Sequence, residues 1–246
     1  MFSRTQIYQM LKMQMEANNQ MSTAWLTSTN AEIPYFRAMH MELNECIDWM
    51  GFKWWKKFSP NLDPAKMELI DVLHFVLSAS LREHFIEKPA HKQTEHMLNN
   101  AADSIMGDCE NLRVRTFRPD VMGVLKPIEE LSEVEVLEDV LREVLTTKGM
   151  TFTSLLHLFV RFGMSSRHVF TLYLGKNLLN RFRTAHGQLE NTYSKIWWGK
   201  EDNDHLIDWL DRNEFEELDS VFIQRADEAL TAMYEQAKSE DALSKA

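Results

Sequence analysis

The chain has 246 residues, enough for one large domain or two small ones, each with a substantial core. Its 8 glycines and 6 prolines are roughly half the usual proportion, which argues against a turn-rich β-sandwich or barrel and favours long helices. A hydrophobic content of 44% excludes general disorder. The formal net charge of −10 would repel a phosphate backbone, so a nucleic-acid partner is not expected.

Cysteine content and hydropathy indicate the compartment. The two cysteines, Cys46 and Cys109, cannot build a disulfide framework, and the N-terminal segment is too polar for a secretory signal. We therefore expect a reducing, cytoplasmic location. No run of apolar residues is long enough to span a membrane, so no membrane partner is expected.

Helical periodicity dominates the chain. It predicts helices over residues 4–20, 35–49, 64–86, 127–147, 151–162, 166–184, 203–218 and 220–240. Residues 21–34 are rich in Ser, Thr and Asn and are expected to form a loop, whereas residues 88–120 give no clear pattern. Asp63 before Pro64 is typical of an N-cap followed by proline at the first helical position. The helix that follows is apolar nearly all round, which predicts a central, buried position.

Two pairs of carboxylates stand at i, i+3 spacing on the second and third predicted helices. Glu42 and Glu45 form one pair, and Glu68 and Asp71 form the other, so each pair projects from one helix face. Burying an ionised carboxylate in an apolar helix costs roughly several kcal/mol unless a counter-charge meets it. A hard divalent cation such as Mg²⁺, completed by substrate phosphates, would supply that charge. The alternative is that each pair lies on a solvated helix face.

A second set of polar residues lies on the helix predicted over 166–184. Lys176, Asn180 and Arg183 follow at i, i+4 and i+7 and therefore share a face. Lysine binds phosphate as a point charge and arginine binds it with two hydrogen bonds, while asparagine can bond a sugar hydroxyl or a phosphate oxygen. Lys195 adds another cation. The alternative is an ordinary surface helix with solvated charges.

Other residues are suited to contact a base. Gln14 and Asn18 are one turn apart, and each amide offers a donor and an acceptor for a base edge, although a polar helix face explains the spacing equally well. Trp55 and Phe75 could stack on a base or belong to the core. His74, one turn beyond the Asp71 carboxylate, could orient a ligand or be a hydrogen-bonded buried histidine.

Four segments together resemble the dimeric all-α dUTPases, which belong to the MazG-type all-α nucleoside triphosphate pyrophosphohydrolases. The segments are Met10-Leu-Lys-Met-Gln14 with Asn18; Met41-Glu-Leu-Asn-Glu45 followed by Lys53-Trp-Trp-Lys56; Glu68-Leu-Ile-Asp71 with His74 and Phe75; and Gly175-Lys-Asn-Leu-Leu-Asn180 with Arg183, Tyr193, Lys195 and Gly199-Lys-Glu-Asp-Asn203. They occur in this order over most of the chain, and the last is the most specific to the dimeric dUTPases.

The resemblance implies an all-α, multi-helix bundle with a metal site between central helices. Residues 1–246 would form a single catalytic unit with a rigid core and a mobile helical subregion, and two copies would form a homodimer. The implied activity is Mg²⁺-dependent hydrolysis of dUTP, and of dUDP, to dUMP. Roughly two or three Mg²⁺ ions would be held by carboxylates, and Glu45 would also accept a proton from the attacking water. The implied metal ligands are Glu42, Glu45, Glu68 and Asp71.

The resemblance also implies roles for the remaining polar and aromatic residues. Those that meet the uracil base are Gln14, Asn18, Trp55, His74 and Phe75. Those that meet the phosphates and the sugar are Lys176, Asn180, Arg183, Tyr193 and Lys195. Two alternatives stay open. One is a pyrophosphohydrolase of dCTP or of a broader range of deoxynucleotides, and the other is a non-catalytic helical interaction protein, against which the four retained carboxylates speak.

Overall fold

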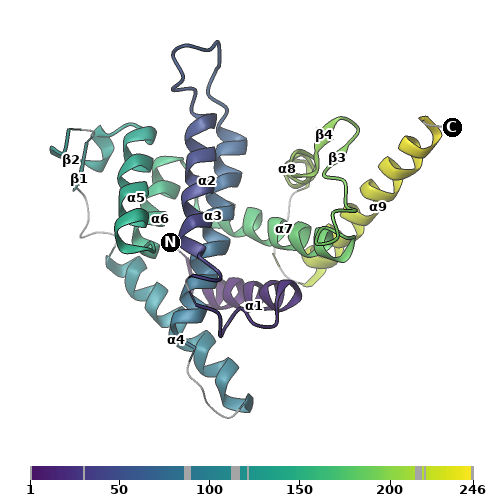
Figure 1. Cartoon of the computed structure of the whole chain (residues 1–246), viewed down its shortest axis with the longest axis horizontal. Helices are drawn as coiled ribbons and strands as arrows, with labels where there is room; N and C mark the ends of the chain where they lie inside the picture. The colour runs from purple at the N-terminus through teal and green to yellow at the C-terminus, as the bar shows by residue number, and fades with distance from the viewer. Residues whose placement is uncertain are drawn as a thin grey trace. The chain divides into compact units, whose positions relative to one another are not determined.

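The computed structural model describes residues 2–29, 31–85, 90–111, 117–120, 122–213, 218 and 220–244, and this part of the chain is mostly helical (Figure 1). The α-helices are α1 (Arg4–Met21), α2 (Tyr35–Trp49), α3 (Leu62–Glu83), α4 (Ala90–Asn111), α5 (Glu133–Thr147), α6 (Phe152–Arg161), α7 (Ser166–Ala185), α8 (Asp202–Arg212) and α9 (Ser220–Ser244). A short 3₁₀ helix, η1 (Ile128–Glu130), precedes α5. The predicted all-α class is confirmed.

In the part of the chain that the structure describes, the strands form two antiparallel hairpins. In the first, β1 (Phe117–Pro119) pairs with β2 (Leu125–Pro127), and in the second, β3 (Ile196–Trp197) pairs with β4 (Lys200–Glu201). Among the described helices, none is long and apolar enough to cross a membrane.

The third predicted helix begins earlier than expected. Its N-cap is Asn61 rather than Asp63, and α3 starts at Leu62. Asp63 therefore lies in the first turn, where its negative charge still favours the helix dipole. Pro64 is tolerated there because the first backbone N–H groups of a helix have no intrahelical partner. The predicted end at residue 86 lies outside the described residues.

Two other predicted helix bounds were wrong, and one helix was not predicted. The helix predicted from residue 127 begins at Glu133, because Ser132 and Glu135 form a capping box that fixes its start. The helix predicted over 203–218 ends at Arg212, and residues 214–217 lie outside the described part. The stretch 88–120, which gave no clear pattern, contains α4; its apolar residues recur one turn apart and are buried, but polar residues separate them. These buried residues are Met97, Leu98, Ala101, Ala102, Ile105 and Cys109.

The described chain divides into two compact units, Met1–Val169 and Phe170–Ala246, and each is described by itself. In the first unit α2 and α3 lie side by side along their lengths (Figure 1). Aliphatic side chains on both helices are completely buried, among them Leu43 on α2 and Leu69 and Leu73 on α3. Helix α1 packs on α3 and α4, and α6 packs on α3, α4 and α5. The expectation of a single catalytic unit over residues 1–246 stays a prediction.

A buried ion-pair network holds the first hairpin on α5 and α6. Arg118, which follows Phe117 in β1, donates from Nη1 to Asp139 Oδ2 over 2.6 Å and from Nη2 to Ser154 Oγ over 2.8 Å. Ser154 in turn donates to Glu143 Oε2 over 2.6 Å. Arg118, Asp139 and Ser154 are each less than 10% exposed. The hairpin is thus fixed by charges that would be costly to leave unpaired.

In the second unit an aromatic cluster ties α7, the segment after it and α9 together. The ring centroid of Tyr234 on α9 lies 5.4 Å from that of Phe182 on α7 and 5.4 Å from that of Tyr193. Trp197, in β3, lies 5.7 Å from the same Tyr234 ring. The cluster therefore fixes where Tyr193 stands relative to α7.

Stability should fall at alkaline pH because of the buried thiol of Cys109 in α4. Burial, followed by the charge of Asp108, raises the pKa of this thiol to about 11. A thiol in the unfolded chain has a pKa of about 8.5, so above this pH the unfolded state loses its proton first. The free energy of unfolding should therefore fall by up to about 1.4 kcal/mol per pH unit between about pH 8.5 and about pH 11.

Urea unfolding of the wild type and of Cys109→Ala, from about pH 8 to about pH 10, measures this slope. Burial also raises the pKa of the Cys46 thiol, which both proteins retain, so its effect cancels in the comparison. The difference in slope between the two proteins is the contribution of Cys109, and parallel pH profiles would contradict the prediction.

Candidate metal and nucleotide site

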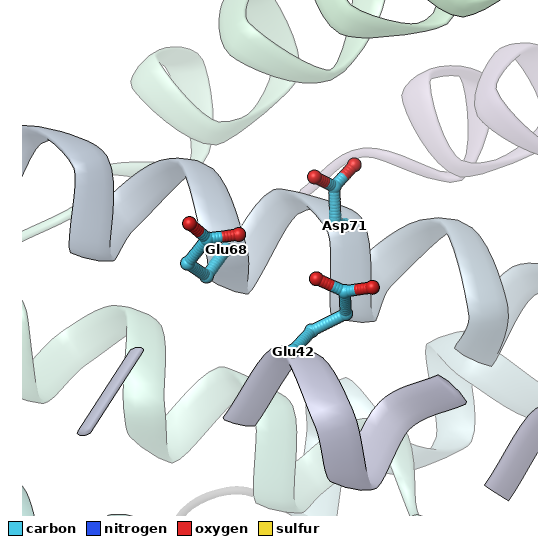
Figure 2. Close-up of side chains that lie close together, drawn as sticks. All are labelled: Glu42, Glu68 and Asp71. Carbon is cyan, nitrogen blue, oxygen red and sulfur yellow. The ribbon is translucent and has the colours of Figure 1, made fainter. Parts of the chain in front are cut away.

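Three carboxylates from α2 and α3 come together in the first unit (Figure 2). Glu42 projects from α2 toward Glu68 and Asp71 on α3, and one oxygen from each lies within 4.8 Å of the other two. All three residues are partly buried. They meet because α2 and α3 pack side by side and because Glu68 and Asp71 are one turn apart.

The donor set of this group fits a hard divalent cation. Around Mg²⁺, with ligands at about 2.1 Å in octahedral geometry, neighbouring oxygens lie about 3 Å apart and opposite ones about 4.2 Å apart, so oxygens within 4.8 Å of one another can reach this geometry by side-chain adjustments. Three carboxylates this close also repel one another, which favours a bound cation. Trp49 Nε1 donates to Glu68 Oε1 over 3.1 Å and orients that carboxylate.

A soft sulfur ligand does not join the carboxylates. The Cys46 thiol donates to the carbonyl of Ala65 over 3.3 Å. Burial, and secondarily the charge of Glu68, raise its pKa above the usual range, so sulfur remains a thiol rather than a thiolate ligand. The group therefore offers only oxygen, which suits magnesium better than zinc.

Glu45, the predicted fourth ligand, lies outside this group. It follows Glu42 by one turn on α2 and is exposed. Within the described residues, the acids that bring three oxygens within 4.8 Å of one another are Glu42, Glu68 and Asp71. The role of Glu45 as ligand and base stays a prediction.

The predicted base-contacting amides form a buried hydrogen-bond network with α3. His74 Nδ1 lies 2.6 Å from Gln14 Oε1, Gln14 Nε2 donates to Asn18 Oδ1 over 2.9 Å, and Asn18 Nδ2 donates to Ser78 Oγ over 3.0 Å. The structure thus brings Gln14, Asn18 and His74 together where α1 packs on α3. Sequence reasoning missed Ser78, although its position one turn beyond His74 was a usable signal.

The two predicted aromatic contacts lie in different surroundings. Phe75 is partly buried, with its ring centroid 6.4 Å from that of Tyr35. Trp55 is 57% exposed and belongs to the connection between α2 and α3 that projects from the ends of these helices in Figure 1. Its ring packs edge-on against Phe52 and Trp54, with centroids 6.1 and 5.7 Å away.

In the second unit, the two predicted phosphate-binding cations of α7 are buried rather than solvated. Lys176 is 2% exposed and Arg183 is 5% exposed, so the alternative of an ordinary surface helix is wrong. Lys176 Nζ donates to Asn203 Oδ1 over 2.9 Å, and Arg183 Nη1 donates to Asn180 Oδ1 over 3.2 Å. These polar groups thus lie together along one face of α7.

Asp202, at the start of α8, was given no role from the sequence. It accepts hydrogen bonds from Arg183 and from the hydroxyl of Tyr193, the latter over 2.8 Å. Burial, and secondarily the Asp202 charge, raise the pKa of the Tyr193 phenol, which therefore stays protonated. Lys195 is exposed, and its backbone carbonyl accepts from the Asp202 N–H over 2.8 Å.

Comparison with known proteins identifies the family. The profile of a dUTPase family matches residues 6–188, about three quarters of the chain. This range contains the three clustered carboxylates, the buried amide network and the α7 residues up to Arg183, whereas Tyr193, Lys195 and Asp202 follow it. A search of curated proteins found no match. The chain belongs to the all-α dUTPase family, whose members are dUTP diphosphatases.

Proposed function

We propose that the chain is a Mg²⁺-dependent enzyme that hydrolyses dUTP, and also dUDP, to dUMP. Family membership supports dUTP hydrolysis. The observation that carries the metal-dependent part is the convergence of Glu42, Glu68 and Asp71 from two packed helices within 4.8 Å. Three carboxylates alone would repel a triphosphate, so a cation must offset their charge before the substrate can bind.

The proposed mechanism assigns separate tasks to the four acids. Glu42, Glu68 and Asp71 would hold Mg²⁺, which when bound would neutralise charge on the phosphoryl oxygens and make water a stronger acid. Glu45, exposed one turn along α2 from Glu42, accepts the proton of the attacking water. Attack at the β-phosphorus would release dUMP from either dUTP or dUDP, which accounts for both proposed substrates.

The remaining residues hold the nucleotide. Lys176, Asn180, Arg183, Tyr193 and Lys195 would bind the phosphates and the sugar. The cations among them would stabilise charge that develops on the phosphate oxygens. On the base side, Phe75 and Trp55 would pack against the ring while Gln14, Asn18 and His74 contact its edge.

The first test is product analysis with dUTP, dUDP and dCTP. We expect dUMP and diphosphate from dUTP, dUMP and phosphate from dUDP, and less dCMP from dCTP. Activity should disappear with a chelator and return with added Mg²⁺, because without a cation the carboxylates would repel the triphosphate. Faster turnover of dCTP than of dUTP would favour the alternative substrate, and no turnover of any nucleotide would refute the proposed activity.

Single substitutions test the separate roles proposed for the base and for the metal ligands. Glu45→Gln should lower kcat by about 10²- to 10⁴-fold because it removes the proposed base. Glu68→Gln should raise the Mg²⁺ concentration needed for half-maximal activity by about 10-fold or more. Far-UV circular dichroism and thermal unfolding would confirm that both variants fold.

Matched controls are exposed acids on the same two helices. Asp48→Asn on α2, where Asp48 pairs with Lys53, and Glu83→Gln on α3 should change neither quantity appreciably. If Glu45→Gln kept wild-type kcat, another group would have to be the base.

We also propose that two copies of the chain form a homodimer. Apart from family membership, this is supported by large exposed apolar side chains in the α2–α3 connection, where Trp54 is 88% and Trp55 is 57% exposed. Light scattering coupled to size-exclusion chromatography should give twice the mass of one chain. A single-chain mass throughout the micromolar range would contradict the proposal.

A further inference from the structure

The carboxylate of Asp202 is completely buried and joins two of the residues proposed to bind phosphate. Its Oδ1 accepts from Arg183 Nη2 over 2.5 Å, and its Oδ2 accepts from Arg183 Nε and from the Tyr193 hydroxyl, both over 2.8 Å. The residue is 0% exposed. One side chain at the start of α8 therefore fixes groups from α7 and from the segment that follows α7.

The bidentate contact with Asp202 fixes the orientation of the Arg183 guanidinium. The edge formed by Nε and Nη2 faces Asp202, so Nη1 is directed to the other side, where it donates to Asn180 Oδ1 over 3.2 Å. A guanidinium is planar, and fixing one edge fixes the whole fork. Asp202 thus aligns Arg183 with the polar face of α7.

The next residue extends the same arrangement to the lysine of α7. Asn203 Oδ1 accepts from Lys176 Nζ over 2.9 Å and from Arg183 Nη2 over 3.2 Å. Two consecutive residues at the start of α8 therefore hold both buried cations of α7. Stability alone does not account for this arrangement, because a buried ion pair contributes about as much as well-packed apolar residues of the same volume.

We propose that Asp202 is a positioning residue of the nucleotide site, which acts through Arg183 and Tyr193 and sets their geometry for the phosphate chain of the substrate. The inference rests on the proposed role of these two residues in phosphate binding. Preorganised donors lose less freedom when the substrate binds, so the alignment should strengthen binding of the phosphates and not of the nucleoside.

The test compares Asp202→Asn with the wild type. The amide keeps the shape of the side chain but removes its charge and one acceptor oxygen. We expect KM for dUTP and the dissociation constant of inorganic diphosphate, measured by calorimetry with Mg²⁺, each to rise about 10-fold or more. The affinity for deoxyuridine, which has no phosphate, should stay within about 2-fold.

A double substitution separates positioning from an independent effect. In an Arg183→Ala background, Asp202→Asn should raise KM by less than about 3-fold, because the residue through which Asp202 acts is already missing. Asp208→Asn is the matched control, since Asp208 is an acid of α8 that is 46% exposed and lies 3.7 Å from Arg212. It should leave all three constants unchanged.

Removing a buried counter-charge could unfold the unit, so thermal unfolding of each variant accompanies the measurements. If Asp202→Asn does not fold, Tyr193→Phe provides the test, because it removes one hydrogen bond to Asp202 and leaves the ion pair intact. It should raise KM for dUTP and the dissociation constant of diphosphate by about 3-fold, again without affecting deoxyuridine.

The proposal is overturned if folded Asp202→Asn, or Tyr193→Phe in its place, binds diphosphate like the wild type. It is also overturned if deoxyuridine binding weakens equally, which would indicate a merely structural role. A third contradicting result is that the increases in KM caused by Asp202→Asn and by Arg183→Ala multiply in the double variant. Failure of the proposed function has a different signature, namely a wild-type protein that hydrolyses no dUTP.

Discussion

The contact between α2 and α3 is the constraint on which the candidate metal site depends. It forces Glu42, Glu68 and Asp71 within 4.8 Å of one another although their charges repel. The opposing contribution comes from apolar burial on the same two helices, where Leu43 and Leu69 are fully buried. Each such side chain contributes roughly 1.5–3 kcal/mol, so a few of them offset the repulsion of partly solvated carboxylates.

In the second unit opposite charges are paired, whereas in the first unit like charges lie close together. Arg183 and Asp202 neutralise each other inside the protein, and the pair is completed by hydrogen bonds from Tyr193 and to Asn180 and Asn203. Such a pair fixes geometry at little net gain in stability. The first unit thus brings like charges together where we propose a metal, and the second pairs opposite charges that fix each other's position; both arrangements would suit the polyanionic substrate proposed above.

The local part of this architecture could be predicted from the sequence, whereas its long-range part could not. Helices α1, α2 and α7 were predicted to within one residue at each end, because periodic apolar positions are a local signal. Ser78 was given no role because its partner Asn18 is 60 residues away. Asp202 lies in the Gly199–Asn203 segment quoted from the sequence but was given no role, because its partner Arg183 is 19 residues away. Helix α4 was missed because the polar residues between its buried positions obscured the period.

The predicted site residues differ in how far the fold has already fixed them. Gln14, Asn18 and His74 are buried and joined by hydrogen bonds, so their orientation is set before any nucleotide arrives. Glu45, by contrast, is exposed on the surface of α2. This difference matches the tasks proposed for them. Base recognition requires donors and acceptors at fixed positions. A carboxylate that accepts a proton must instead be accessible to water, and its oxygens must not be occupied by strong internal hydrogen bonds.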